Sequence, residues 1–147
     1  MRVFLGGLGV VAALTLAPFA VADQVYHSQH VPLVPVTATS PGGGFVENTH
    51  ANGPVNYAHE IYVLQGALPN TTYTVTLSIY GDSNCGGLIA SLTTATFMTN
   101  GAGNGEGDAK ISPADADGLR GHTLYVQWTV TSATSTYRTA CSQVVLD

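Results

Sequence analysis

Positive charge is scarce in this chain. Only four of its 147 residues are Lys or Arg, against nine Asp or Glu, and the formal net charge is −5. Proteins bind nucleic acids largely by neutralising phosphates with cations, and anionic membranes attract clustered Lys and Arg. The shortage of cations therefore argues against nucleic acids and anionic membrane surfaces as partners.

Long hydrophobic runs are also lacking, except at the N-terminus. Arg2 precedes an uncharged apolar run over residues 3–16, and small residues end the segment as Ala20-Val21-Ala22. This order is typical of a secretory signal peptide, so residues 1–22 are predicted to be removed by cleavage. A membrane anchor is the alternative, because about 20 uncharged residues are just enough to span a bilayer.

Cleavage would leave residues 23–147 as a single secreted domain that acts outside the cell, with no further membrane segment. Residues 23–30 are polar, and we expect them to form a flexible arm. Three cations would remain against nine acidic residues, a net charge of −6.

Cysteine occurs only twice, as Cys85 and Cys141. Two cysteines in an exported chain most often pair, so a disulfide between them is predicted. It would enclose roughly 57 residues, for which chain entropy suggests a stabilisation of about 4 kcal/mol. Free or intermolecularly paired thiols are the alternative.

What the sequence does contain is a two-residue alternation of apolar and hydroxyl-bearing residues. Side chains alternate between the two faces of a strand, so this period indicates strands with one buried face. The residues predicted to face the core are Tyr73, Val75, Leu77, Ile79, Leu124, Val126, Trp128 and Val130. For residues 57–65 two registers remain open, with either Ala58, Tyr62 and Leu64 or Ile61 and Val63 pointing inward.

Seven or eight such strands are separated by short turns, and no helical period follows residue 22. This pattern predicts an all-β fold, with a two-sheet antiparallel sandwich as the first choice and a closed barrel as the second. Residues 31–38 contain Pro32 and Pro35. Because proline cannot donate to a ladder, this segment is predicted to be an edge strand or an extended segment lying on the sheet.

The segment Leu68-Pro69-Asn70-Thr71-Thr72-Tyr73-Thr74-Val75 resembles the L-x-P-x-T-x-Y-x-V corner of fibronectin type III and related immunoglobulin-like domains, shortened by one residue. The resemblance implies an immunoglobulin-like sandwich in which Leu68 closes one end of the core. It also implies that the Tyr73 hydroxyl bonds back to the backbone and that Trp128 is the core tryptophan. Domains of this kind usually bind partners or space other modules.

The acidic residues near the turn at 113–121 are a candidate metal site. Asp108, Asp115 and Asp117 offer the oxygen ligands that Ca²⁺ prefers, although an ordinary Asp/Gly turn explains the same composition. The five histidines show no spacing typical of a metal site. We therefore expect no cofactor.

Local signatures of nucleophilic catalysis, such as a G-x-S-x-G elbow, are missing, so no catalytic residues and no enzyme activity are expected. Tyr57, Tyr125 and Tyr137 are expected on the surface, where tyrosine suits a flat binding platform. Scattered surface tyrosines that pack across strands are the alternative.

The function predicted from these features is a secreted, non-catalytic binding or structural module. Its partner would be an extracellular protein, a carbohydrate or further copies of the chain. The alternatives are a small-ligand carrier with an apolar cleft between the sheets and a secreted hydrolase or metalloenzyme. A pocket around Trp128 would favour the carrier, clustered His and Asp the enzyme, and a flat aromatic face the module.

Overall fold

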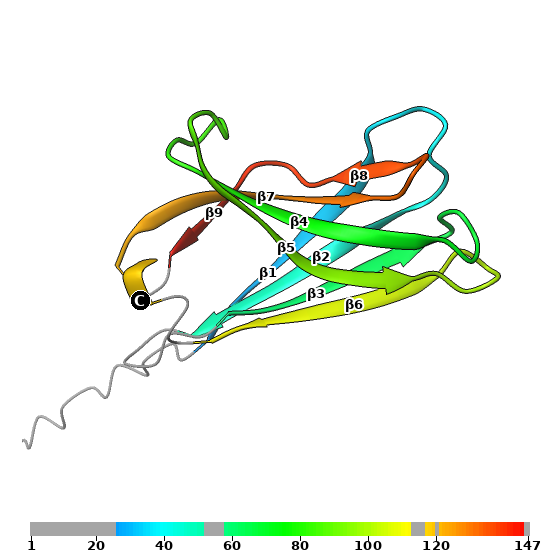
Figure 1. Ribbon diagram of the computed structural model, residues 1–147. Helices are drawn as coiled ribbons and strands as arrows, with labels where there is room; N and C mark the ends of the chain where they lie inside the picture. Colours follow the sequence, from blue (N-terminus) through cyan, green and yellow to red (C-terminus); the bar gives the residue numbers. More distant parts are fainter. Residues whose placement is uncertain (1–25, 52–57, 113–116, 120, 146–147) are drawn as a thin grey trace, which may run out of the picture.

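The computed structural model describes residues 26–51, 58–112, 117–119 and 121–145. Within these residues the chain forms nine strands and one 3-10 helix (Figure 1). The elements are β1 (Tyr26–Pro35), β2 (Gly43–Ala51), β3 (Ala58–Gln65), β4 (Thr72–Tyr80), β5 (Leu88–Met98), β6 (Gly105–Ile111), η1 (Asp117–Leu119), β7 (Thr123–Thr131), β8 (Thr136–Arg138) and β9 (Ser142–Val145).

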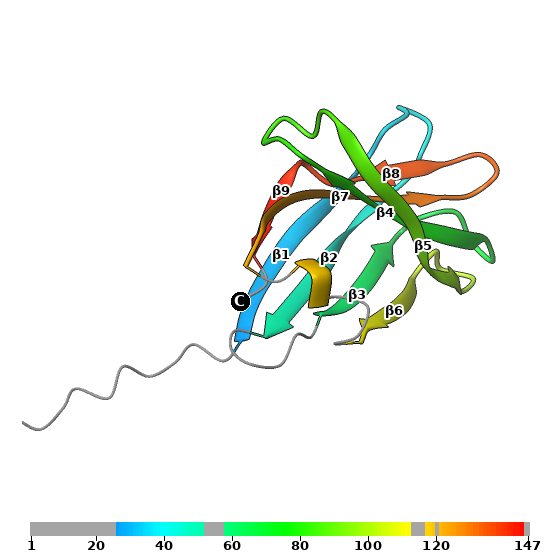
Figure 2. The same ribbon diagram turned by 60° about the vertical axis from the view of Figure 1, so that its left-hand side comes forward.

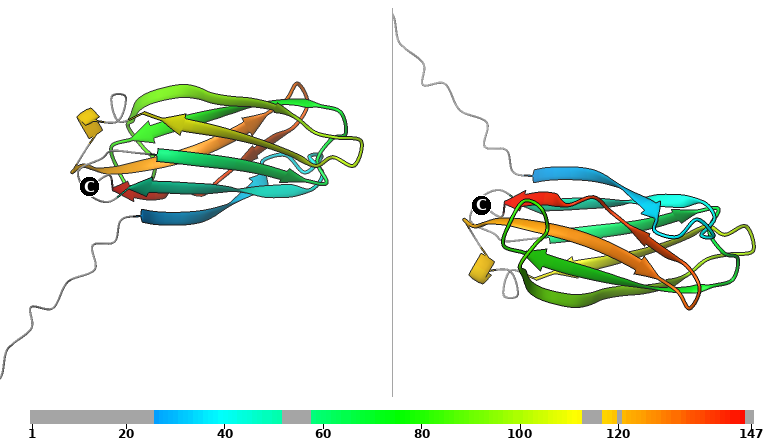
Figure 3. Two further views of the ribbon diagram at one scale, coloured as in Figure 1. Left: turned by 90° about the horizontal axis from the view of Figure 1, so that it is seen from below. Right: turned by 90° about the horizontal axis from the view of Figure 1, so that it is seen from above.

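All strand pairs are antiparallel, and together they make a nearly closed, barrel-like sheet. The hydrogen-bonded order is β5-β4-β7-β8-β1-β2-β3-β6, and β9 also pairs with β7. Figure 3 shows β1, from the middle of this order, on the opposite side of the molecule from β5. The prediction of an all-β antiparallel fold is confirmed, but the path has no break between two separate sheets. The arrangement is therefore closer to the barrel that was the second choice.

The N-terminal strand differs from its prediction in two ways. Residues 26–30 belong to β1, which pairs with β2 from Tyr26↔Ala51 to Leu33↔Gly44, so this part of the expected arm is a strand. The strand is also not at an edge, because Val34 and Pro35 pair with Arg138 and Tyr137 of β8. On the β8 side of β1, only Val34 and Pro35 have ladder partners. The missing N–H groups of Pro32 and Pro35 therefore remove few ladder hydrogen bonds.

The core lies between the inward faces of this sheet, and the alternating residues fill it. Tyr73, Val75, Leu77, Ile79, Val126, Trp128 and Val130 are all buried. Leu124 is half-buried and packs against them. In β3 the register is the one with Ala58, Tyr62 and Leu64 inward, so Ile61 and Val63 face outward.

The corner before β4 forms the hydrogen bond that the resemblance implies. The Leu68 N–H donates to the Tyr73 hydroxyl at 3.3 Å, and that hydroxyl also bonds with Ser135 Oγ at 2.9 Å. Leu68 itself is only half-buried and lies outside the core cluster, so its predicted core position is wrong. The neighbouring Ala67 is buried instead, because the turn at Gly66, with φ 65°, directs Ala67 inward.

The predicted disulfide is present between Cys85 and Cys141, with 5.7 Å between their Cα atoms. Cys85 lies in the turn between β4 and β5, and Cys141 lies between β8 and β9. The turn is built around Asp82, whose Oδ1 accepts hydrogen bonds from the N–H groups of Asn84 and Gly86. The bridge therefore links the turn between β4 and β5 to the segment before β9, although the two are far apart in the sequence.

The two ends of the strand order, β5 and β6, meet along what we call the seam. They lie together near the hairpin that joins them and diverge toward the other end of the molecule (Figure 1). At the hairpin end Phe97 covers Gly105 and Gly107, where an added Cβ would come within 3.1 and 2.7 Å of its ring. The absence of two side chains thus lets β5 approach β6 at this closed end. The opposite end of the seam is the open end.

Removing the disulfide should lower stability substantially. We expect the double variant Cys85→Ser, Cys141→Ser to lose about 2–4 kcal/mol of unfolding free energy, since the cross-link restrains the unfolded chain. Urea unfolding followed by circular dichroism measures the loss, and the wild type in reductant is the matched comparison. Equal unfolding midpoints for the oxidised wild type and the variant would contradict the expectation.

The closed end of the seam should not tolerate a side chain on β6. We expect Gly107→Ala to destabilise the fold by about 1–3 kcal/mol, because the new methyl group would displace Phe97. Gly101→Ala is the control, since nothing lies within 4 Å of its Cβ position. Thermal unfolding of both variants checks this, and similar melting temperatures would contradict it.

Candidate ligand-binding cavity

A cavity of about 380 Å³ lies inside the sheet at the open end. Its walls are mostly apolar and come from both sides of the barrel. The lining residues are Asn48, Ala58, Glu60, Leu77, Ile79, Ala90, Leu92, Ile111, Gly118, Leu119, Leu124, Val126, Trp128 and Val144. Apolar walls with a few polar groups are typical of small-ligand sites.

The divergence of β5 from β6 gives solvent access to this interior. Ala90 and Leu92 pair with the buried Ile79 and Leu77 of β4 and therefore share their inward face. Leu92 is nonetheless 40% exposed, and Ala90 is exposed as well. Figure 2, with this end turned forward, shows η1 at the open end of the molecule, and its Gly118 and Leu119 are among the lining residues.

A row of three polar residues crosses the inward face of the sheet beside the cavity. Gln29 of β1 pairs with Asn48 of β2, and Asn48 pairs with Glu60 of β3. Asn48 and Glu60 are each only 2% exposed, and both line the cavity. We refer to Gln29, Asn48 and Glu60 as the polar row. Buried polar groups are costly unless they are hydrogen-bonded, so this row requires an explanation.

Glu60 is held by a tyrosine two residues further along the same face. The Tyr62 hydroxyl donates to Glu60 Oε2 and lies 2.7 Å from Thr94 Oγ1 on β5. Thr94 is the extra residue of a β-bulge, since Ala95 and Thr93 pair with the consecutive Val75 and Thr76. The bulge turns Thr94 toward the interior, as bulges often redirect a side chain.

Burial controls the ionisation of this pair. It raises the pKa of Glu60 above the ordinary value of 4.5, and the hydrogen bonds from Tyr62 and Trp128 offset part of the rise. The pKa of Tyr62 is also raised, mainly by burial and then by the negative charge of Glu60. The Trp128 N–H is near enough to Glu60 to lower the pKa of the carboxyl group. Trp128 Nε1 nevertheless forms no hydrogen bond of normal geometry within the described part of the chain.

Three buried polar atoms near Glu60 therefore have unused hydrogen-bonding capacity. Trp128 Nε1, Asn48 Oδ1 and Gln29 Oε1 have no hydrogen-bond partner among the residues that the structure describes. Leaving such a group unsatisfied costs about 1–3 kcal/mol. The buried end of the cavity can thus bind a polar group, while its walls accept an apolar body.

Neither Glu60 nor Asn48 was among the residues that the sequence pattern singled out. The alternation carried a signal for Glu60, because in one of the two registers it falls on the same face as Ala58, Tyr62 and Leu64. A carboxylate in the middle of an apolar face is uncommon unless it is paired or functional. Asn48 gave no comparable signal, since its burial depends on pairing between distant strands.

Of the three tyrosines proposed as a platform, the structure describes Tyr125 and Tyr137. Tyr137 is fully buried, so its predicted exposure is wrong. It pairs with the buried Val130 and shares its inward face, and its hydroxyl donates to the Pro41 carbonyl at 2.6 Å. Burial, with a smaller effect from Tyr73, raises the pKa of Tyr137 to about 12. Tyr125 is half-buried on β7, and Tyr57 lies outside the described residues.

The acidic residues predicted as metal ligands are only partly described. Asp108 lies on the exposed face of β6, with its Oδ2 3.5 Å from His59 Nε2. Asp115 is outside the described residues, and Asp117 is described only as part of η1. In the described ranges, no group of three or more His, Cys, Asp or Glu side chains could hold a metal ion.

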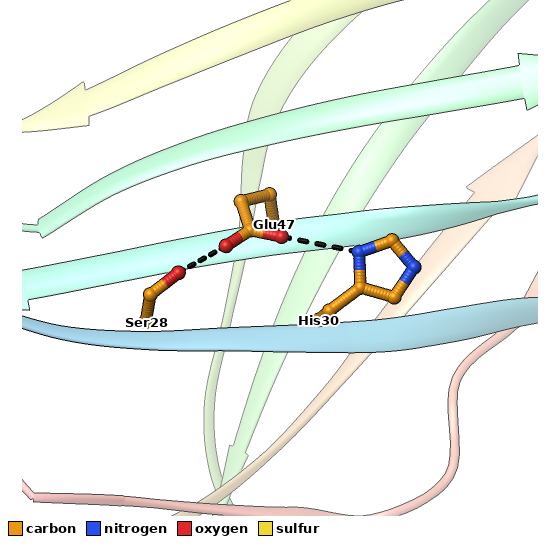
Figure 4. Close-up of polar contacts among 3 residues, drawn as sticks. All are labelled: Ser28, His30 and Glu47. Atoms are coloured by element: carbon orange, nitrogen blue, oxygen red, sulfur yellow. Dashed lines mark hydrogen bonds and ion pairs between the residues drawn. The ribbon is translucent and has the colours of Figure 1, made fainter.

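Ser28, His30 and Glu47 form a polar cluster on the outer face of β1 and β2 (Figure 4). Glu47 lies between the other two, accepting a hydrogen bond from Ser28 Oγ and contacting His30 Nδ1 at 3.1 Å. A catalytic serine requires the histidine beside the hydroxyl and the carboxylate behind the histidine. The order here is different, so the cluster does not have the arrangement of a catalytic triad.

The raised pKa of Glu60 predicts a specific pH dependence. The folded protein holds the Glu60 proton more tightly than the unfolded chain, so this contribution to stability is full below about pH 4 and is lost as pH rises through the folded-state pKa. We expect Glu60→Gln to gain stability relative to wild type as pH increases from 4 to 8.

Urea unfolding of both proteins at several pH values measures this difference, and Glu106→Gln on the exposed face is the control. A difference between Glu60→Gln and wild type that stays constant with pH would show that Glu60 titrates normally.

Comparisons with protein-family models, curated proteins and solved structures find no match for this chain. In the part of the chain that the structure describes, no helix has the length and apolar character needed to cross a membrane. The geometry of the cavity is therefore the basis for assigning a function.

Proposed function

We propose that this protein binds a small, mostly apolar molecule in the cavity at the open end, and that it works as an extracellular carrier or binding protein. The observation that supports this most directly is a 380 Å³ cavity with apolar walls that contains a buried carboxyl group. Its volume is within the range of about 300–1,000 Å³ typical of sites for small ligands.

The distribution of polar and apolar groups supports the same function. Leu77, Ile79 and Val126 form apolar walls, and Glu60 with Asn48 provides a polar region. A ligand of matching character would gain free energy from apolar burial of about 25 cal/mol per Å² and would be oriented by the polar region. Burying a carboxyl group costs free energy, so its presence beside an apolar cavity supports a role in binding.

Recognition through an aromatic surface is less well supported. Of the three tyrosines considered for it, Tyr137 is buried, Tyr125 is half-buried, and Tyr57 lies outside the described residues. The pocket beside Trp128, in contrast, is the feature expected of a carrier.

Export from the cell agrees with the chemistry of the chain. The Cys85–Cys141 disulfide indicates an oxidising environment, and the N-terminal segment has the pattern of a signal peptide. Two features support a relationship of this fold to immunoglobulin-like sandwiches. They are the hydrogen bond from the Leu68 N–H to the Tyr73 hydroxyl and the buried side chain of Trp128.

Trp128 provides a direct assay, because it is the only tryptophan and it lines the cavity. We expect apolar ligands of up to about ten non-hydrogen atoms to change its fluorescence in a saturable manner. Ala90→Phe should weaken binding at least about tenfold, since the ring would occupy the inward face of β5 at the opening.

Ser91→Phe is the matched control, because it adds the same ring to the neighbouring exposed position, on the other face of β5. Equal effects of the two substitutions on binding, or no saturable change with any apolar ligand, would refute the proposed function.

A further inference from the structure

We propose that the ligand is an ammonium compound: a primary amine with a small apolar body, whose cationic head lies against Glu60 and Asn48. This inference rests on the proposed function and specifies the chemical class of the ligand. The observation behind it is an imbalance between hydrogen-bond acceptors and donors at the buried end of the cavity.

Acceptors dominate this region. Glu60 accepts a hydrogen bond from Tyr62 through Oε2. Asn48 Oδ1 and Gln29 Oε1 are further acceptors without a partner there. Trp128 Nε1 is a donor without a hydrogen bond of normal geometry among the described residues, and it lies near enough to Glu60 to lower the pKa of that carboxyl group. A ligand suited to this site must supply donors, and an ammonium group supplies three with no acceptor.

The orientation of the Gln29 amide strengthens this count. Its Nε2 donates to the Gln143 carbonyl of β9 at 2.7 Å, and only the amino side of the amide can do so. Gln29 Oε1 is thereby left as the acceptor beside Asn48 in the polar row. In the polar row, the two amide oxygens are thus acceptors without a hydrogen-bond partner among the described residues, and Asn48 is one of the residues that line the cavity.

The charge of the site points to the same class of ligand. A buried carboxylate needs an opposite charge, yet Lys110 and Arg138 are both exposed, and none of the ion pairs among the described residues includes Glu60. A neutral alcohol could donate one hydrogen bond but could not balance the charge. An ammonium ion does both, and the net negative charge of the chain favours its approach.

The apolar part of the ligand is limited by the walls of the cavity. Besides Glu60, the lining includes Leu77 and Ile79 of β4, which pair with the exposed Leu92 and Ala90 of β5. The body of the amine would lie along these apolar residues, with its far end toward the solvent-accessible side of β5. Short alkylamines and arylalkylamines have this shape.

The test compares two ligands with nearly the same apolar body, 2-phenylethylamine and 2-phenylethanol, titrated against the disulfide-bonded protein at pH 7 by Trp128 fluorescence and calorimetry. We expect the amine to bind at least about tenfold more tightly than the alcohol to the wild type. In Glu60→Gln this preference should fall to about twofold or less, with the affinity for the alcohol retained. Glu106→Gln removes an exposed charge from β6 and should keep the full preference.

The possible outcomes distinguish a failure of the ammonium assignment from a failure of the proposed ligand-binding function. Saturable binding of the alcohol that equals or exceeds that of the amine would overturn the ammonium assignment while leaving a ligand-binding cavity. An amine preference that persists in Glu60→Gln would also overturn it, because the head group would then lie elsewhere. Binding of neither compound, nor of any other apolar ligand, would refute the cavity function itself.

Discussion

The contact of Phe97 with two glycines of β6 is the constraint on which the architecture depends. Because Gly105 and Gly107 lack side chains, the Phe97 ring can lie over them and bring the two ends of the strand order together. The contact acts only at the hairpin end, since the inward residues at the start of β5 are Ala90 and the partly exposed Leu92. A seam that closes at the hairpin end and diverges at the other leaves the interior covered at one end and accessible at the other.

Tyr62 connects the closed end of the seam to the candidate site. In the ladder it is paired with Gly107, the glycine beneath Phe97, and its hydroxyl reaches both Glu60 and Thr94. The bulge at Thr94 supplies the β5 end of this connection. The geometry that closes the barrel therefore also fixes the position of the buried carboxyl group, which places a polar anchor at the inner limit of the cavity.

How far the sequence predicts this structure depends on how local each feature is. The alternation in Tyr73–Ile79 and Leu124–Val130 is a property of single strands, and it predicted the strands and most of the core. The burial of Tyr137 and the internal position of β1 arise from pairing between β8 and β1, about 100 residues apart, which no local pattern reveals. Glu60 is an intermediate case. One of the two possible registers of residues 57–65 placed Glu60 on the inward face, but its proximity to Trp128 becomes visible only in the folded structure.

The disulfide has a role that its contribution to stability alone does not describe. Cys85 lies in the turn between β4 and β5, at the open end, and its Sγ is 3.8 Å from the carbonyl of Val126, a cavity residue. Cys141 comes directly before β9, whose Val144 lines the same cavity. Since β5 has no ladder partner across the seam, this wall is where the barrel would otherwise open most easily. The cross-link holds it in place, so a ligand meets a preformed cavity and binding loses less free energy to ordering the protein.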